Sequence, residues 1–376
     1  MDTEDVADSQ KGQRADRKIE EPLFVEEGTY SLDDRVIVGS KFTNTLEIEL
    51  EGVVLTEEAT IPIYIMSAPV DLKGKEVTVK IISSDGLPYE CVKTPSKAYE
   101  AGTRYGLTCD KMVQSNVIFD DESFKAYCVN NFDLDGDGEV SYAEANVVTY
   151  ISCSSKGISS LKGIEYFINL TRLSCDFNQL TSLDVSKNVM LEELNCYFNQ
   201  LTSLDVSHNT ALKVLSCTDN PLMSLDVSHN TALTSLLCDF NQLTSLDVSH
   251  NTALTGLNCS SNQLTSLDVS HNTALTGLNC SSNQLTSLDV SQNTALTELT
   301  CSSNYLTSLD VSKNTALTVL HCIYNQLTSL DVSQNTALIL LYCNHNPTLT
   351  DIWLKTGQTI SVFEYDTGVA TIKYRD

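Results

Sequence analysis

Apolar and polar residues recur with a fixed period of 21 positions across the second half of the chain. One period, at 254–274, reads LTGLNCSSNQLTSLDVSHNTA and has two similar halves, L-x-x-L-x-C-x-x-N and L-x-x-L-D-V-S-x-N. In each half, the triplet that ends in cysteine or valine alternates inward, outward and inward, which is the period of a β-strand. A constant period of this length predicts a solenoid in which each copy is one coil and stacked triplets form parallel sheets.

Ten of the 13 cysteines mark this period. They are Cys153, Cys175, Cys196, Cys217, Cys238, Cys259, Cys280, Cys301, Cys322 and Cys343. At an inward strand position an unpaired cysteine acts as a small apolar side chain, so we expect these ten to pack in the core. Parallel Cβ vectors about 4.8 Å apart suit a disulfide poorly, and the run lacks the histidine or C-x-x-C pair of a zinc site. Whether Cys91 pairs with Cys109 or with Cys128 is left open.

Each half of the repeat ends in an asparagine, whose short side chain can hydrogen-bond turn backbone that would otherwise be buried without a partner. We therefore expect two asparagine ladders along the stack. The first contains Asn178, Asn199, Asn220, Asn241, Asn262, Asn283, Asn304, Asn325 and Asn346, and the second Asn188, Asn209, Asn230, Asn251, Asn272, Asn293, Asn314 and Asn335.

The repeat resembles that of the leucine-rich repeat family, most closely the bacterial 21-residue class (IRREKO type). Its consensus is L-x-x-L-x-L-x-x-N-x-L-x-x-L-D-L-x-x-N-x-x, in which cysteine here replaces the third leucine and valine the leucine after aspartate. The resemblance covers residues 148–358. It implies a β-rich solenoid of about ten coils with parallel sheets.

Residues 23–112 have a different character, with short alternating segments such as Ile61–Ile65 and Val77–Ile81 separated by turn signals. They predict a small antiparallel β-sandwich. The stretch TIPIYIMSAPVDLKGKEVTVKIISSDGLPYE, followed by YEAGTRYGLTC, is similar to the closing part of a fimbrillin-like domain of Bacteroidetes surface proteins. The polar residues 1–22 are expected to be disordered.

Residues 133–144 read DLDGDGEVSYAE and match the EF-hand loop D-x-D-x-D-G-x-x-x-x-x-E. The ligands this loop predicts for Ca²⁺ are Asp133, Asp135, Asp137, the carbonyl of Glu139, Ser141 through water, and bidentate Glu144. The alternative is an acidic turn that holds no ion. With an incoming helix at about Glu122–Asn131, residues 113–147 resemble the N-terminal cap of Bacteroidetes leucine-rich repeat proteins, which implies a structural role for calcium.

At the other end, Ile360–Tyr365 and Val369–Tyr374 flank Asp366–Thr367–Gly368. This pattern predicts a β-hairpin within residues 359–376 that covers the exposed edge of the last coil.

Two polar columns are expected on the second half of the repeat. The aspartates are Asp184, Asp205, Asp226, Asp247, Asp268, Asp289, Asp310 and Asp331, and the histidines are His208, His229, His250 and His271. Stacked carboxylates repel, so some aspartates should titrate high or bind cations; alternatively, each accepts hydrogen bonds from nearby Ser, Thr or backbone groups. The histidines are expected to be exposed, because glutamine and lysine take the same position in later coils.

The charge and the motifs exclude several functions. A net charge of −26 in 376 residues disfavours nucleic acid and anionic membranes as partners. No run approaches the roughly 18 apolar residues that span a bilayer, and the first 22 residues lack the apolar stretch of a signal peptide. Serine, histidine and aspartate recur in every coil, whereas a catalytic group occurs once, so we expect a non-enzymatic protein.

The first half of the repeat varies at its outward positions, whereas SLDVSxNTA hardly changes. Variation on one surface of a constant scaffold indicates where a ligand binds, with exposed aromatic residues as anchors. The candidates are Phe177, Tyr197, Phe198, Phe240, His321, Tyr324 and Tyr342. We expect a monomeric adhesion or binding module for a protein partner, and the family resemblance implies a cell-surface or secreted location. The alternatives are a carbohydrate- or mucin-binding protein and a structural spacer or fimbrial accessory.

Overall fold

The computed structural model describes residues 45–49, 62–65, 77–82, 88–93, 105–108 and 113–376. The chain divides into two compact units. The first consists of Met1–Asn116 with Ser141–Ala143, and the second of Val117–Val140 with Glu144–Asp376. The segment 1–22, expected to be disordered, lies outside the described residues.

The first unit contains two small sheets. The strands are β1 (Thr45–Glu49), β2 (Pro62–Ile65), β3 (Val77–Ile82), β4 (Pro88–Lys93), β5 (Tyr105–Thr108) and β6 (Val113–Gln114). One sheet has the order β1-β3-β4-β6 and the other pairs β2 with β5. The expected antiparallel arrangement is correct for β3–β4, β4–β6 and β2–β5, but β1 runs parallel to β3. A parallel pair needs a long connection, and residues 50–76 between the two strands are long enough to make one.

The second unit begins with helix α2 (Glu122–Phe132), one residue longer than expected. Asp121 caps it by accepting hydrogen bonds from the amides of Ser123 and Phe124 at 2.9 and 3.0 Å. Phe124 and Cys128 are fully buried, so this face of the helix belongs to the core. The other helices are the short α3 (Tyr142–Asn146) and the 3₁₀ turn η2 (Ile164–Tyr166). No helix in the described ranges is long and apolar enough to cross a membrane.

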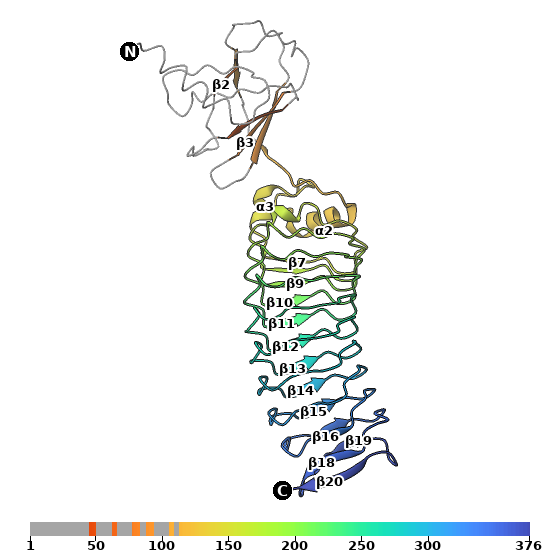
Figure 1. Ribbon diagram of the computed structural model, residues 1–376. Helices are drawn as coiled ribbons and strands as arrows, with labels where there is room; N and C mark the ends of the chain where they lie inside the picture. Colours follow the sequence, from red (N-terminus) through yellow and green to blue (C-terminus); the bar gives the residue numbers. More distant parts are fainter. Residues whose placement is uncertain (1–44, 50–61, 66–76, 83–87, 94–104, 109–112) are drawn as a thin grey trace, which may run out of the picture. The chain divides into compact units, whose positions relative to one another are not determined.

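The repeats stack into one parallel sheet of 11 strands (Figure 1). In chain order these are β7 (Tyr150–Ser152), β8 (Arg172–Ser174), β9 (Glu193–Asn195), β10 (Val214–Ser216), β11 (Ser235–Leu237), β12 (Gly256–Asn258), β13 (Gly277–Asn279), β14 (Glu298–Thr300), β15 (Val319–His321), β17 (Leu340–Tyr342) and β19 (Val362–Glu364). Equivalent residues pair in register, as Leu257 does with Leu278. The predicted solenoid is confirmed, with one coil more than the ten expected.

The prediction of a C-terminal hairpin is wrong. An additional coil lies in its place. Strand β19 joins β17 in the large sheet, whereas β20 (Thr371–Arg375) pairs in parallel with β18 (Asp351–Lys355). With β16 (Ser329–Asp331), these last two form a separate three-stranded sheet. The chain between β19 and β20 therefore passes from one face of the coil to the other, and both strands satisfy the open edges left by the preceding coil.

The core is built as predicted from leucine, cysteine and valine at the inward positions. In the middle coil, Leu257 is 2% exposed, and Cys259 and Val269 are 0% exposed. All ten periodic cysteines are buried and unpaired, as is Cys128. Burial raises the pKa of these thiols, for example to about 12 at Cys217, because a thiolate would lose its hydration. Cys109 lies outside the described residues.

Both asparagine ladders are present and bind backbone across coils. The Nδ2 group of Asn262 donates to the carbonyl oxygens of Cys238 and Cys259 at 3.0 and 3.1 Å. In the second ladder, Asn272 donates to the carbonyls of Val248 and Asn251, both at 2.9 Å. The same contacts recur along the stack, so each asparagine satisfies buried carbonyl groups at a turn.

The second half of the repeat forms less regular sheet than expected. Its strands within the described part of the chain are β16, β18 and β20, together with an isolated bridge between Asp184 and Asp205. In all eight coils that carry the aspartate, its side chain accepts a hydrogen bond from the amide two residues later. Ser249 donates in this way to Asp247 Oδ1 at 2.9 Å. That contact closes a local turn after the aspartate.

Candidate binding face and calcium loop

The most exposed aromatic candidates share one backbone position, the second residue after each periodic cysteine. All ten residues there have φ between 51° and 57°, in the left-handed region. They are Ser155, Phe177, Phe198, Asp219, Phe240, Ser261, Ser282, Ser303, Tyr324 and His345, and we call them the corner column. A residue with a side chain costs roughly 1–2 kcal/mol in this conformation. Because the conformation repeats, the side chains leave successive coils in the same direction and lie above one another.

Rings in neighbouring coils of the corner column stack face to face. The centroids of Phe177 and Phe198 are 4.6 Å apart with planes at 12°, and those of Tyr324 and His345 are 4.2 Å apart at 25°. Tyr197, beside the column, meets Phe177 edge-on at 5.2 Å. His345 was not among the candidates from the sequence. Its position two residues after Cys343 is the signal that identifies it.

His321 and Tyr342 lie on the outer face of the large sheet rather than in the column. They occupy paired positions of β15 and β17, and their rings meet edge-on at 4.7 Å. Burial lowers the pKa of His321, and the nearby charge of Glu298 acts in the opposite direction. The Nε2 atom of this histidine is buried without a hydrogen-bond partner.

The structure thus divides the seven candidates into four places. Phe177, Tyr197 and Phe198 form one aromatic cluster in the first coils. In the last coils, His321 pairs with Tyr342 on the outer face of the sheet, and Tyr324 stacks on His345 in the corner column. Phe240 is 59% exposed and stands apart from these. Between Phe240 and Tyr324 the corner column carries serine, at Ser261, Ser282 and Ser303.

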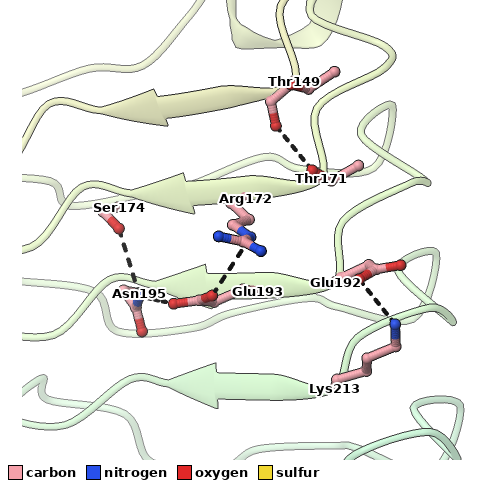
Figure 2. Close-up of polar contacts among 8 residues, drawn as sticks. All are labelled: Thr149, Thr171, Arg172, Ser174, Glu192, Glu193, Asn195 and Lys213. Carbon is pink, nitrogen blue, oxygen red and sulfur yellow. Dashed lines mark hydrogen bonds and ion pairs between the residues drawn. The ribbon is translucent and has the colours of Figure 1, made fainter.

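The outer face next to the first cluster is polar and ordered by contacts between coils (Figure 2). Lys213 pairs with Glu192 at 2.9 Å, and Arg172 lies 3.9 Å from Glu193. The side chain of Asn195 donates to Glu193 at 2.9 Å. These ion pairs are largely exposed and contribute about 0–1 kcal/mol each. Their main effect is to hold a defined pattern of charge beside the aromatic rings.

A shallow groove of about 400 Å³ opens in the corner column next to Phe240. Its walls are Asn199, Asp219, Asn220, Pro221, Phe240, Asn241, Gln242 and Ser261. Asp219 is half-buried, and its carboxylate has no hydrogen bond or ion pair to any described residue. This groove therefore combines one aromatic wall, an unpaired carboxylate and side-chain amides.

The expectation that some column aspartates titrate high is wrong. In each of the eight, Oδ1 accepts a hydrogen bond from the serine amide two residues later. At Asp247 the hydrogen bonds from the backbone and then the side chain of Ser249 lower the carboxyl pKa. The same direction holds at Asp184, Asp205, Asp226, Asp268, Asp289 and Asp310. Local hydrogen bonding outweighs the screened repulsion between exposed charges.

The four stacked histidines are exposed, as expected. The Nδ1 atoms of His208, His229, His250 and His271 lie 3.2–3.3 Å from the hydroxyl of the preceding serine. Each therefore has a local partner within its own coil.

In the predicted calcium loop, the carboxylates of Asp133, Asp135 and Asp137 converge. One oxygen of each lies within 4.8 Å of the others, the one such carboxylate group in the described part of the chain. Gly136 and Gly138 have φ of 75° and 89°, which lets the loop turn sharply. Asp133 accepts hydrogen bonds from the amides of both glycines at 2.7 and 2.9 Å. Desolvation acts to raise the pKa of the Asp133 carboxyl, but the hydrogen bonds from the amides of Gly138, Gly136 and Asp137 together outweigh it, so this pKa is lowered.

The remaining loop residues have defined places. Glu144 is buried, and its Oε1 accepts hydrogen bonds from the amides of Leu134 and Asp135. The Glu139 side chain pairs with Lys125 at 2.8 Å, so its backbone carbonyl is what it offers to an ion. Val140 is fully buried, and its carbonyl accepts from the Val117 amide at 2.8 Å. Hard oxygen donors on a loop tied to the core fit Ca²⁺.

Comparison with known proteins gives two kinds of similarity. No protein-family model matches the sequence. A stretch of 73 residues is 42% identical to internalin J of Listeria monocytogenes serotype 4b (strain F2365). That stretch is 19% of this chain and spans 8% of the length of internalin J.

Among solved structures, the functional domain of InlJ from L. monocytogenes, described as including a cysteine ladder, is 34% identical. The similarity covers 68% of this chain and 70% of that domain, with a TM-score of 0.49. A leucine-rich repeat protein of Leptospira interrogans is 23% identical, with a TM-score of 0.52 over 62% of this chain and 69% of that one. The second similarity shows a shared fold. With the periodic cysteine in ten of its 11 stacked coils and the following asparagine in nine, this chain is a leucine-rich repeat protein, and a stretch of 73 of its residues is similar to internalin J.

Proposed function

We propose that this chain is a non-enzymatic module that binds a protein partner through the corner column and the adjoining outer face of the large sheet. The supporting observation is the placement of aromatic residues at a strained position. Positive φ and an exposed fraction of 45–59% are shared by Phe177, Phe198, Phe240 and Tyr324. Serine takes the same position in other coils, at Ser261, Ser282 and Ser303. Folding gains little from a half-exposed ring in a strained conformation, while a rigid exposed ring is a good binding anchor.

Stacked repeats present an extended surface that suits a protein partner, which agrees with this role. We further propose a cell-surface or secreted location. Its support is the acidic composition and the full burial of the cysteine ladder, because buried thiols with raised pKa values resist oxidation. The likeness of residues 23–112 to a fimbrillin-like domain and a Bacteroidetes source remain predictions from the sequence.

The binding role is tested on protein and glycan arrays with the full chain. The variant Phe198→Ser/Phe240→Ser/Tyr324→Ser puts into three coils the residue that others already carry there. The matched control, His229→Ser/His250→Ser/His271→Ser, changes three exposed side chains on the second half of the repeat. We expect a protein partner for the parent, loss of that partner in the aromatic variant at an unchanged unfolding midpoint, and normal binding in the control. Binding to glycans alone would identify a carbohydrate-binding protein instead, and the absence of any partner would favour a spacer.

We propose as a second part of this function that Ca²⁺ orders the start of the solenoid. Asp133, Asp135 and Asp137, with Glu144 at the end of the loop, would hold the ion. The three converging aspartate carboxylates favour a divalent cation, because their mutual repulsion is relieved on binding. Since α2 packs its buried residues into the core directly before the loop, the ion would stabilise the first coil rather than act as a switch.

Calorimetric titration with Ca²⁺ tests the site on the parent and on Glu144→Gln. The substitution Asp120→Asn serves as control, because it removes one exposed charge outside the loop. We expect one bound ion for the parent and the control, and at least about tenfold weaker binding for Glu144→Gln, which loses the bidentate ligand. Equal calcium uptake by all three proteins would show that the loop is not the site.

A further inference from the structure

The aromatic residues at the start of the corner column are interrupted at one position, which Asp219 occupies. Phe177 and Phe198 stack at 4.6 Å, which is close to the spacing of neighbouring strands. The next coil carries Asp219 instead of a ring, and the coil after that carries Phe240. The order along the column is therefore ring, ring, carboxylate, ring, with the same positive φ at all four positions.

The gap has the size of one planar group. Phe198 and Phe240 are two coils apart, which is roughly 9–10 Å along the stack at about 4.8 Å per strand. A group midway between them would lie within about 6 Å of both ring centroids, the range of a cation–π contact. The groove of about 400 Å³ opens at this place, and its walls include Asp219, Phe240 and Asn199, the residue after Phe198.

The Asp219 carboxylate places an unpaired negative charge in the gap. No described residue forms a hydrogen bond or ion pair with the Asp219 carboxylate. The net charge of the whole chain is −26, so a basic partner is also attracted at long range. A planar cation satisfies both the stacking position and the carboxylate.

As a refinement of the protein-binding role proposed above, we propose that the gap over Asp219 receives an arginine side chain of the partner protein. The guanidinium would stack between Phe198 and Phe240 and donate to the Asp219 carboxylate. Arginine fits better than lysine, because its planar group both stacks on aromatic rings and pairs bidentately with a carboxylate. The amide of Gln242 in the groove wall is available to the peptide that carries the arginine.

The test uses the full chain and two capped tripeptides, acetyl-Gly-Arg-Gly-amide and its citrulline counterpart, which has nearly the same shape without the charge. Saturation-transfer NMR at 0.15 M salt gives both dissociation constants. The variants are Asp219→Ser and Phe240→Ser, since serine already occupies the corner column at Ser261 and Ser282. Glu298→Gln is the control, because it removes one charge from the outer face of the sheet away from the groove.

We expect the parent to bind the arginine peptide about fivefold more tightly than the citrulline peptide. This ratio should fall to about one in Asp219→Ser, binding of both peptides should weaken in Phe240→Ser, and Glu298→Gln should retain the parental ratio. A parental ratio of about one, or an equal loss in Glu298→Gln, overturns the arginine site. A protein partner from the arrays that binds Asp219→Ser as well as the parent also overturns it, yet leaves the protein-binding role intact.

Discussion

The side-chain amide of Asn262 donates a 3.0 Å hydrogen bond to the carbonyl oxygen of Cys238, one coil earlier. Its Oδ1 accepts from the Leu243 amide at 2.9 Å, so one side chain ties two segments of the preceding coil to its own. Asn262 is only 8% exposed, which means that water cannot replace these partners. The position is therefore a point where a short polar side chain holds the stack together.

We predict that Asn262→Ala lowers the free energy of unfolding by about 1–3 kcal/mol, because buried backbone groups lose their partners. Urea denaturation followed by circular dichroism measures the change. Gln263→Ala, at the exposed neighbouring position, should change stability by less than about 0.5 kcal/mol. Equal effects of the two substitutions would contradict the role of the asparagine ladder.

The buried thiols predict a loss of stability in alkali. Burial, with a smaller contribution from Asp239, raises the pKa of Cys217 to about 12, and burial raises that of Cys153 to about 12. A cysteine in the unfolded chain has a pKa of about 8.5. Because the folded pKa is raised, the stabilising contribution is complete below about pH 8.5 and is lost as the pH rises towards 12.

Urea midpoints between pH 7.5 and 10.5 should therefore fall above about pH 8.5. The variant Cys217→Ala/Cys259→Ala is less stable at neutral pH, because it leaves small cavities, but its decline with pH should be shallower than that of the parent. Parallel declines in the two proteins would show that other groups cause the alkaline effect.

Replacing an aromatic residue of the corner column by glycine separates binding from folding. Phe240 has φ of 51° and is 59% exposed, so its ring contributes little burial while its backbone is strained. We predict that Phe240→Gly leaves the unfolding midpoint unchanged or raises stability by up to about 1 kcal/mol. Thermal denaturation of the full chain measures this. A clear loss of stability would mean that the ring has a structural role and would weaken its assignment as an anchor.

The last coil is held by a cluster around Trp353. The Arg375 guanidinium lies 4.2 Å from the indole centroid and 2.7 Å from Asp331, while Lys373 pairs with Asp351 at 2.7 Å. We predict that Arg375→Ala costs about 0.5–1 kcal/mol, since both contacts are partly exposed. Hydrogen exchange should become faster in β18 and β20 but not in β12. Unchanged exchange in the terminal strands would show that the backbone ladder alone closes the stack.

Much of the architecture follows from local sequence. The leucine, cysteine, valine and asparagine positions of each coil were predicted correctly, because a period of 21 residues repeats the same environment and the apolar alternation marks the inward face. Helix α2 was also predicted, from residues directly before the loop at Asp133. The hairpin within residues 359–376 was not predicted correctly, because two alternating segments around a turn look alike in a hairpin and in a coil. Strand partners outside the segment decide between the two.

The sequence by itself determined the repeat, the buried cysteine ladder and the loop with calcium-binding spacing, since each depends on side-chain type at a regular interval. Only the tertiary structure decided which variable positions meet. Positive φ at the corner column directs the side chains of successive coils the same way. As a result, Phe177 stacks on Phe198 and Tyr324 on His345, whereas Asp219 interrupts the aromatic residues. The direction of a side chain depends on backbone torsion and on the neighbouring coil, and neither can be read from residue spacing alone.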